Sequence, residues 1–201
     1  MHPSSDDIET YYEFPVFLSF LVKNGRAVVY PVYQGTFERQ DPRFLAIFRG
    51  AENHAYTEFV IQLVKDFSRT VDYLETRQDI DVERIAYYGM SWGGILGTII
   101  PAVEDRLQTS ILLPAMYLGR GRPEVHQANY ISRITLPTLL FAGEYDTNNP
   151  IEQVIRPLFN MLGTPEEHKT MIIYPTDHIP PMNEVIRETL AWLDIYLGPV
   201  M

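Results

Sequence analysis

A serine, an aspartate and a histidine each follow an apolar stretch of this 201-residue sequence, and together they could carry out nucleophilic catalysis. Ser91 lies in Gly89-Met90-Ser91-Trp92-Gly93, between an apolar run at 84–88 and a helix-like stretch at 95–103. This G-x-S-x-G pattern at a strand-to-helix junction is typical of a nucleophile elbow, a sharp turn that lifts the serine hydroxyl clear of a sheet. The turn needs small residues two positions before and two after the serine, and Gly89 and Gly93 supply them.

A serine hydroxyl is a good nucleophile only when a histidine accepts its proton and an acid orients that histidine. On a parallel sheet these groups must lie in the loops at the carboxyl ends of the strands. Asp146 follows the strand expected at 137–142, and His178 follows the strand expected at 169–174. The sequence therefore predicts Ser91 as nucleophile, His178 as base and Asp146 as the orienting acid. The Trp92 N–H is the predicted oxyanion donor.

Other residues compete for these roles. Glu144 lies in the same loop as Asp146 and is the alternative acid, whereas Asp177 is interpreted as loop structure because it adjoins the base. The Trp92 side chain is expected either to line a substrate pocket or simply to pack. The remaining histidines do not follow a strand in the required order and are interpreted as surface or loop residues: His2, His54, His126 and His168.

Predicted strands and helices alternate along the chain. Short apolar runs predict strands at 26–31, 84–88, 109–113, 137–142 and 169–174. Amphipathic or capped stretches predict helices at 15–23, 58–76, 95–103, 150–162 and 183–197. The expected fold class is therefore α/β, with a mostly parallel, doubly wound sheet. The loop at 32–54 is long enough to line a site, with Tyr33 and Gln34 as candidate substrate contacts.

The amino-acid composition of the chain argues against several classes of function. The apolar content of 46% suffices for one buried core, and the net charge of −10 argues against nucleic acid or an anionic membrane as partner. The chain has no cysteine, which excludes disulfides and thiolate metal sites. Metal-ligand spacing and a phosphate-binding loop are also missing, so neither a metal nor a cofactor is expected. The first residues lack signal-peptide features, and no apolar run could span a bilayer, so a cytoplasmic protein is expected.

Several stretches of the chain together resemble a known family. They are 25–39 (GRAVVYPVYQGTFER), 87–94 (YYGMSWGG), 136–139 with 143–146 (LPTL and GEYD), and 178–181 (HIPP). The sequence looks like an α/β-hydrolase of the acetylxylan-esterase or dienelactone-hydrolase type, close to those found beside bacterial serine/threonine kinase domains. The match runs from about residue 15 to the end, and residues 1–201 are expected to form a single domain.

The resemblance also implies differences at the start of the sheet and a lid segment within the chain. Relatives of this kind begin with further strands and take a second oxyanion donor from a loop after the third strand. The sheet here is therefore expected to lack the first strands. Related folds insert a lid or cap in the position of residues 114–135, which otherwise form only a connection. Candidate substrate contacts in this segment are Tyr117, Arg120, Arg122 and Asn129.

The implied function is a serine hydrolase that cleaves small-molecule carboxylic esters through an acyl-enzyme. Two alternatives stay open. One is a serine peptidase of the same fold, and the other is a truncated hydrolase-like module with little activity that serves as an interaction domain. For the oligomeric state, two expectations stay open. The chain forms a homodimer, or it associates through an exposed edge of the sheet.

Overall fold

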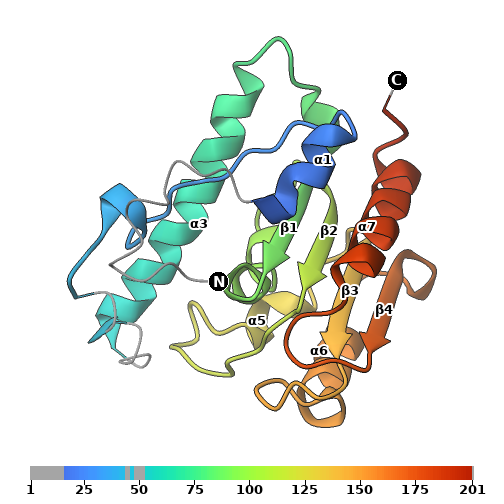
Figure 1. Ribbon diagram of the computed structural model, residues 1–201. Coiled ribbons are helices and arrows are strands. Elements are labelled where there is room, and N and C mark those ends of the chain that lie inside the picture. Colours follow the sequence, from blue (N-terminus) through green and yellow to red (C-terminus); the bar gives the residue numbers. More distant parts are fainter. Residues whose placement is uncertain (1–15, 44–45, 48–52, 201) are drawn as a thin grey trace. The chain divides into compact units, whose positions relative to one another are not determined.

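The structure is a computed structural model, and it describes residues 16–43, 46–47 and 53–200 (Figure 1). The chain divides into two compact units. The first unit comprises Met1–Ile80, Arg120–Val125 and Val200–Met201. The second unit comprises Asp81–Gly119 and His126–Pro199. The expectation of a single domain over the whole chain stays a prediction.

The first unit is built mainly from helices. After the short turn η2 (Val16–Leu18) come α1 (Ser19–Lys23), η3 (Phe37–Arg39) and the long helix α3 (His54–Glu75). Helix α3 begins four residues before the predicted start because the Asn53 side chain caps it. The Asn53 Oδ1 accepts a hydrogen bond from the Tyr56 N–H at 2.9 Å, which satisfies one of the free donors at the helix start.

The strand predicted at 26–31 is wrong. These residues adopt irregular backbone between α1 and η3, and they take no part in the sheet. Val29 and Tyr30 remain 43% and 48% exposed. An apolar run with β-forming residues becomes a strand only when a neighbouring strand pairs with its backbone groups, and no ladder of the described sheet includes this run.

The second unit contains a four-stranded sheet. After the turn η4 (Val82–Arg84), its strands are β1 (Ile85–Met90), β2 (Leu107–Leu113), β3 (Thr138–Gly143) and β4 (Lys169–Tyr174). They lie side by side in the order β1-β2-β3-β4, and every pair is parallel (Figure 1). The predicted α/β class with a parallel sheet is confirmed. Because all strands point the same way, their carboxyl ends share one edge.

Several helices of the second unit differ from the predicted ones. The helix after Ser91 is only α4 (Trp92–Leu96), followed by the turn η5 (Ile100–Ala102), rather than one helix over 95–103. Glycines weaken this stretch as a helix and Pro101 interrupts it. The predicted helix at 150–162 is a π-helical turn, η6 (Ile151–Ile155), followed by α6 (Arg156–Met161), with Pro157 in the first turn of α6. The remaining elements are α5 (Ala128–Ile131), η7 (Glu166–His168) and α7 (Met182–Tyr196).

Helices α4 and α7 cover opposite faces of the sheet. The Trp192 Nε1–H of α7 donates a hydrogen bond to the Thr109 Oγ1 of β2 at 2.7 Å. A Cβ atom added at Gly97, which follows α4, would lie 2.3 Å from the Leu112 Cδ2 of the same strand. Side chains three positions apart on a strand point to opposite faces, so the sheet is covered on both sides. This confirms the predicted arrangement of helices around the sheet.

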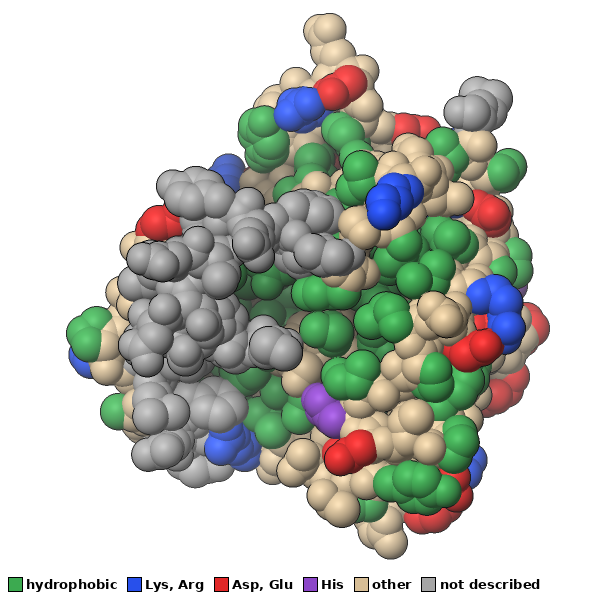
Figure 2. All heavy atoms as spheres, viewed as in Figure 1, with side chains coloured by type: hydrophobic (Ala, Val, Ile, Leu, Met, Phe, Trp, Pro, Cys, Tyr) green, Lys and Arg blue, Asp and Glu red, His purple; other side chains and the backbone are tan. Residues whose placement is uncertain are grey.

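The core of the second unit is formed by the central strands. Strand β3 is buried along its whole length, and Phe141 has no exposed surface. Acidic and basic side chains are interspersed on the face shown in Figure 2. None of the described helices is both long and apolar enough to cross a bilayer.

Candidate active site

Three side chains from separate loops of the second unit form a hydrogen-bonded chain. The distance between the Ser91 Oγ and the His178 Nε2 is 3.1 Å, and the distance between the His178 Nδ1 and the Asp146 Oδ2 is 2.7 Å. If the Nδ1 carries the proton and donates it to the carboxylate, the Nε2 is free to accept the Ser91 hydroxyl proton. Ser91, Asp146 and His178 are the residues that the sequence predicted as nucleophile, acid and base.

Ser91 lies in a sharp turn between β1 and α4. Its φ of 51° and ψ of −102° are unusual for a residue other than glycine. The Ser91 N–H donates a hydrogen bond to the Leu113 carbonyl at the end of β2, which ties the turn to the neighbouring strand. Trp92, the predicted oxyanion donor, is the first residue of α4.

The two glycines of the motif differ in how closely they are packed. A Cβ atom at Gly89 would lie 2.4 Å from the Gly93 carbonyl oxygen, so only glycine fits at that position. Beyond its own helix backbone and its chain neighbours, a Cβ atom at Gly93 would meet the Tyr87 hydroxyl at 3.8 Å. Steric crowding therefore explains the glycine before the serine, whereas the surroundings of Gly93 leave space for a Cβ atom.

The loops that carry Asp146 and His178 are joined directly to each other. The Glu144 N–H donates to the Tyr174 carbonyl at 2.8 Å, and the Tyr145 N–H donates to the Thr176 carbonyl at 2.9 Å. Gly143 makes this approach possible, because a Cβ atom there would lie only 1.8 Å from the Asp177 carbonyl oxygen. A glycine at the end of β3 thus lets the acid and the histidine approach each other.

Asp146 and its competitor Glu144 have different surroundings. Asp146 is 3% exposed, and its Oδ1 accepts the Asn148 N–H at 2.9 Å while its Oδ2 faces His178. Glu144 is exposed to solvent. Asp177 is also exposed, and its carboxylate accepts the backbone N–H of His178 at 2.8 Å. Asp146 is the carboxylate that contacts the imidazole ring.

The sequence analysis missed two residues beside Ser91. The Met116 Sδ lies 3.5 Å from the Ser91 Oγ, within range of a weak O–H···S hydrogen bond. Gln127, which is 3% exposed, donates from its Nε2 to the Met116 carbonyl and to the Thr98 Oγ1. Met116 follows a strand end, as Asp146 and His178 do, so the same rule could have identified it. No local pattern distinguishes Gln127.

Two of the predicted substrate contacts lie in the second unit. The Tyr117 N–H donates to the Asn149 Oδ1 at 3.4 Å, and its ring packs edge-on against His126 at a centroid distance of 6.2 Å. Asn129 lies exposed in α5. The segment at 114–135 contains buried residues as well, among them Ala115 and Ile131. Its role as a lid stays a prediction.

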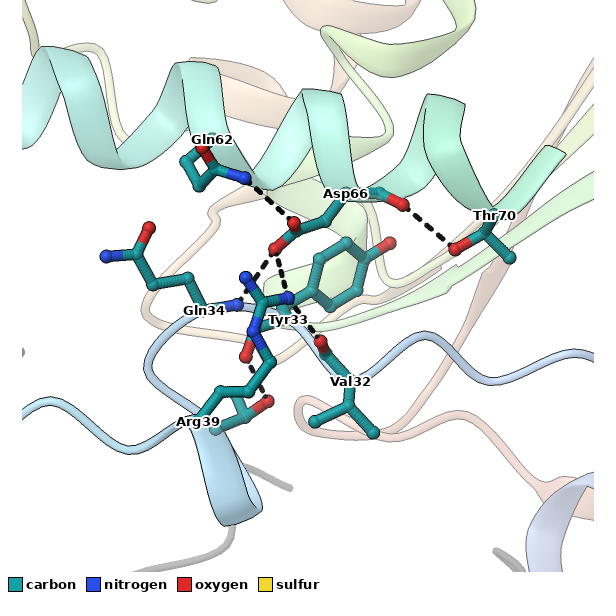
Figure 3. A network of polar contacts seen from close by, with 8 residues as sticks. Val32, Tyr33, Gln34, Arg39, Gln62, Asp66 and Thr70 are labelled. Atoms are coloured by element: carbon teal, nitrogen blue, oxygen red, sulfur yellow. Dashed lines mark hydrogen bonds and ion pairs between the residues drawn. The ribbon is translucent and has the colours of Figure 1, made fainter. Parts of the chain in front are cut away.

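The other predicted contacts lie in the first unit. Asp66 of α3 accepts hydrogen bonds from the Gln34 N–H at 3.0 Å and from the Arg39 guanidinium at 2.7 Å (Figure 3). Burial raises the pKa of Tyr33, and the nearby Tyr30 and Asp66 raise it further, so Tyr33 stays a neutral phenol. The Arg120 guanidinium lies over the Tyr56 ring at 5.8 Å, and Arg122 forms a 3.7 Å ion pair with Glu124. The predicted substrate role of these residues is not tested by these contacts.

A cavity of about 670 Å³ lies beside the acid loop. It is lined by Asp146 and its neighbours, by η6 and by Ile173 of β4. Neither Ser91 nor His178 lines it, so it is not the space in which a substrate would meet the serine. Within the described part of the chain, no group of three or more His, Asp or Glu side chains could hold a metal ion.

Solved structures share this fold. The polyethylene-glycol complex of a cold-adapted esterase from an Arctic intertidal metagenomic library aligns with a TM-score of 0.63 and 21% identity over 82% of this chain and 67% of the esterase. Acetyl xylan esterase 1 from Thermoanaerobacterium sp. JW/SL YS485 aligns with a TM-score of 0.62 and 15% identity over 92% of this chain and 70% of that enzyme. This likeness shows that the chain shares the fold of these esterase structures.

The family can also be stated. The family model described as "Dienelactone hydrolase family" matches residues 19–178, and the chain belongs to this family. A curated relative, cutinase est2 of Thermobifida alba, is 25% identical over a 138-residue alignment that covers 64% of this chain and 43% of the cutinase. The chain thus spans less than half the length of that relative. It covers 60% of the native cold-adapted esterase, with a TM-score of 0.58.

Proposed function

We propose that this chain is a serine hydrolase that cleaves small-molecule carboxylic esters. The observation that carries the proposal is the hydrogen-bonded chain from Ser91 through His178 to Asp146, with distances of 3.1 and 2.7 Å. The relatives support the reaction class, since they include proteins named as esterases and a cutinase.

The proposed reaction has two halves. The Ser91 Oγ attacks the ester carbonyl while the His178 Nε2 accepts the hydroxyl proton, and Asp146 stabilises the resulting imidazolium. The Trp92 N–H donates a hydrogen bond to the oxyanion of the tetrahedral intermediate. His178 then returns the proton to the departing alcohol, which leaves an ester between Ser91 and the acyl group. A water molecule, deprotonated by His178, hydrolyses this acyl-enzyme and releases the acid.

The proposal is tested by ester hydrolysis with the purified chain and a Ser91→Ala variant. Loss of the nucleophile is expected to lower kcat by about 10⁴- to 10⁶-fold. Ser132→Ala is a matched control, because Ser132 is an exposed serine of the same unit. This variant should hydrolyse esters at the wild-type rate. If Ser91→Ala retains the wild-type rate, the assignment is wrong. If the wild-type chain shows no hydrolysis, the inactive interaction module becomes the better account.

A further inference from the structure

Met116 places a sulfur atom against the proposed nucleophile. Its Sδ lies 3.5 Å from the Ser91 Oγ, while the His178 Nε2 lies 3.1 Å from the same oxygen. A serine hydroxyl has one proton and can donate it to only one of these acceptors at a time. A thioether sulfur is a weak acceptor, so the imidazole nitrogen takes the proton. The proton transfer in the proposed function depends on this preference.

The segment around Met116 is held in place from both sides. The buried Gln127 donates from its Nε2 to the Met116 carbonyl at 2.9 Å and accepts the Leu118 N–H on its Oε1 at 2.8 Å. The same Nε2 also donates to the Thr98 Oγ1 at 2.7 Å, which anchors Gln127 to the turn after α4. The backbone of Met116 therefore has little freedom to withdraw the sulfur from Ser91.

We propose that Met116 is an oxidation site that turns the hydrolase off. The inference rests on the proposed function of Ser91. A peroxide, such as hydrogen peroxide, oxidises the sulfur by two electrons. The O–O bond breaks, one oxygen atom forms the S–O bond of methionine sulfoxide, and the other leaves as water. Met116 is only half-buried, so a molecule as small as hydrogen peroxide can reach it.

The sulfoxide changes the acceptor beside Ser91. Its oxygen is strongly polar, in contrast to the weakly accepting thioether. With the Met116 backbone held by Gln127, this oxygen lies within reach of the Ser91 hydroxyl and competes with the His178 Nε2 for its proton. It also occupies space beside the nucleophile. Both effects lower the rate of acyl transfer, and methionine sulfoxide reductase, which removes the oxygen, restores it.

The test compares wild type, Met116→Leu and Met90→Leu before and after treatment with hydrogen peroxide. Leucine conserves the volume of methionine approximately and cannot be oxidised. Met90 adjoins Ser91 in the chain and is half-buried like Met116, which makes Met90→Leu the matched control. Ester hydrolysis of each variant is expressed relative to its own untreated sample, and peptide mass spectrometry measures the sulfoxide at each methionine.

The expected result is at least a tenfold loss of rate in wild type and in Met90→Leu. The loss should follow the sulfoxide fraction at Met116 and reverse with the reductase. Met116→Leu should keep its untreated rate, even when Met161, which is 41% exposed, is fully oxidised. The proposal is overturned if Met116→Leu loses activity in parallel with wild type, if Met90→Leu is the resistant variant, or if Met116 escapes oxidation.

Failure of the proposed function has a different signature. In that case untreated wild type shows no ester hydrolysis, so the deficit precedes the oxidant and both proposals fall together. An active wild type that carries sulfoxide at Met116 and keeps its full rate overturns the oxidation site alone.

Discussion

The carboxylate of Asp146 is buried, yet both of its oxygens have partners. Its Oδ1 accepts the Asn148 N–H, and its Oδ2 faces the His178 Nδ1 at 2.7 Å. Burying a carboxylate is costly unless hydrogen bonds and charge compensate for the lost water. The local backbone therefore holds this side chain in the one orientation that also positions the imidazole. Glu144, two residues earlier in the same loop, is exposed and has no such constraint.

This contrast predicts different effects of two conservative substitutions. Asp146→Asn keeps the shape but favours the imidazole tautomer with the proton on the Nε2, which cannot accept the Ser91 proton. By analogy with the serine-protease triad, kcat should fall by about 10⁴-fold. Glu144→Gln should leave kcat nearly unchanged. The kcat values of both variants are measured by steady-state ester hydrolysis. A large loss in Glu144→Gln with little loss in Asp146→Asn would assign the orienting acid to Glu144.

At the scale of elements, the ends of β3 and β4 bring the acid and the base together. Gly143, the last residue of β3, is paired with Tyr174, the last residue of β4. The loops that follow them are joined by the Tyr145 N–H and the Thr176 carbonyl. The close contact between Gly143 and the Asp177 carbonyl leaves no space for a side chain. The geometry of the site thus depends on a residue that carries no chemistry itself.

Gly143→Ala should therefore damage the site from a distance. The new Cβ atom, 1.8 Å from the Asp177 carbonyl oxygen, must push the His178 loop away. We expect kcat to fall by about 10²-fold or more, because a displacement of about 1 Å in a catalytic group can lower the rate by that factor. We also expect the free energy of unfolding to fall by about 1–3 kcal/mol. Thr147→Ala, exposed in the same loop, is the control for both kinetics and urea denaturation. Wild-type kinetics in Gly143→Ala would show that the two loops can separate without harm.

For the molecule as a whole, the central strands were the most predictable part. The runs that became β2 and β3 are short and largely apolar, as expected for strands covered on both faces. Since parallel strands end at one edge, the order of Ser91, Asp146 and His178 along the chain was enough to predict their proximity. The catalytic roles of these residues remain a proposal.

The errors arose where local pattern does not determine structure. The run at 26–31 has the composition of a strand, but strand formation depends on a pairing partner that sequence pattern cannot supply. Gly94 and Gly97, which with Pro101 shorten the helix after Ser91, are required by close contacts with the end of β2, a segment distant in the sequence. Gln127 was missed for the same reason, because its four partners lie outside its own turn. Association through an edge strand, β1 or β4, stays a prediction.

The central claim is that Ser91 is an activated nucleophile in the folded chain. A fluorophosphonate probe, which reacts with serines activated by a neighbouring base, tests it directly. We expect one probe per folded chain, located on the Ser91 peptide by mass spectrometry. Labelling should be lost in Ser91→Ala, in His178→Ala and after unfolding in urea. A folded wild-type chain that leaves Ser91 unlabelled, or that reacts equally well without His178, would contradict the account.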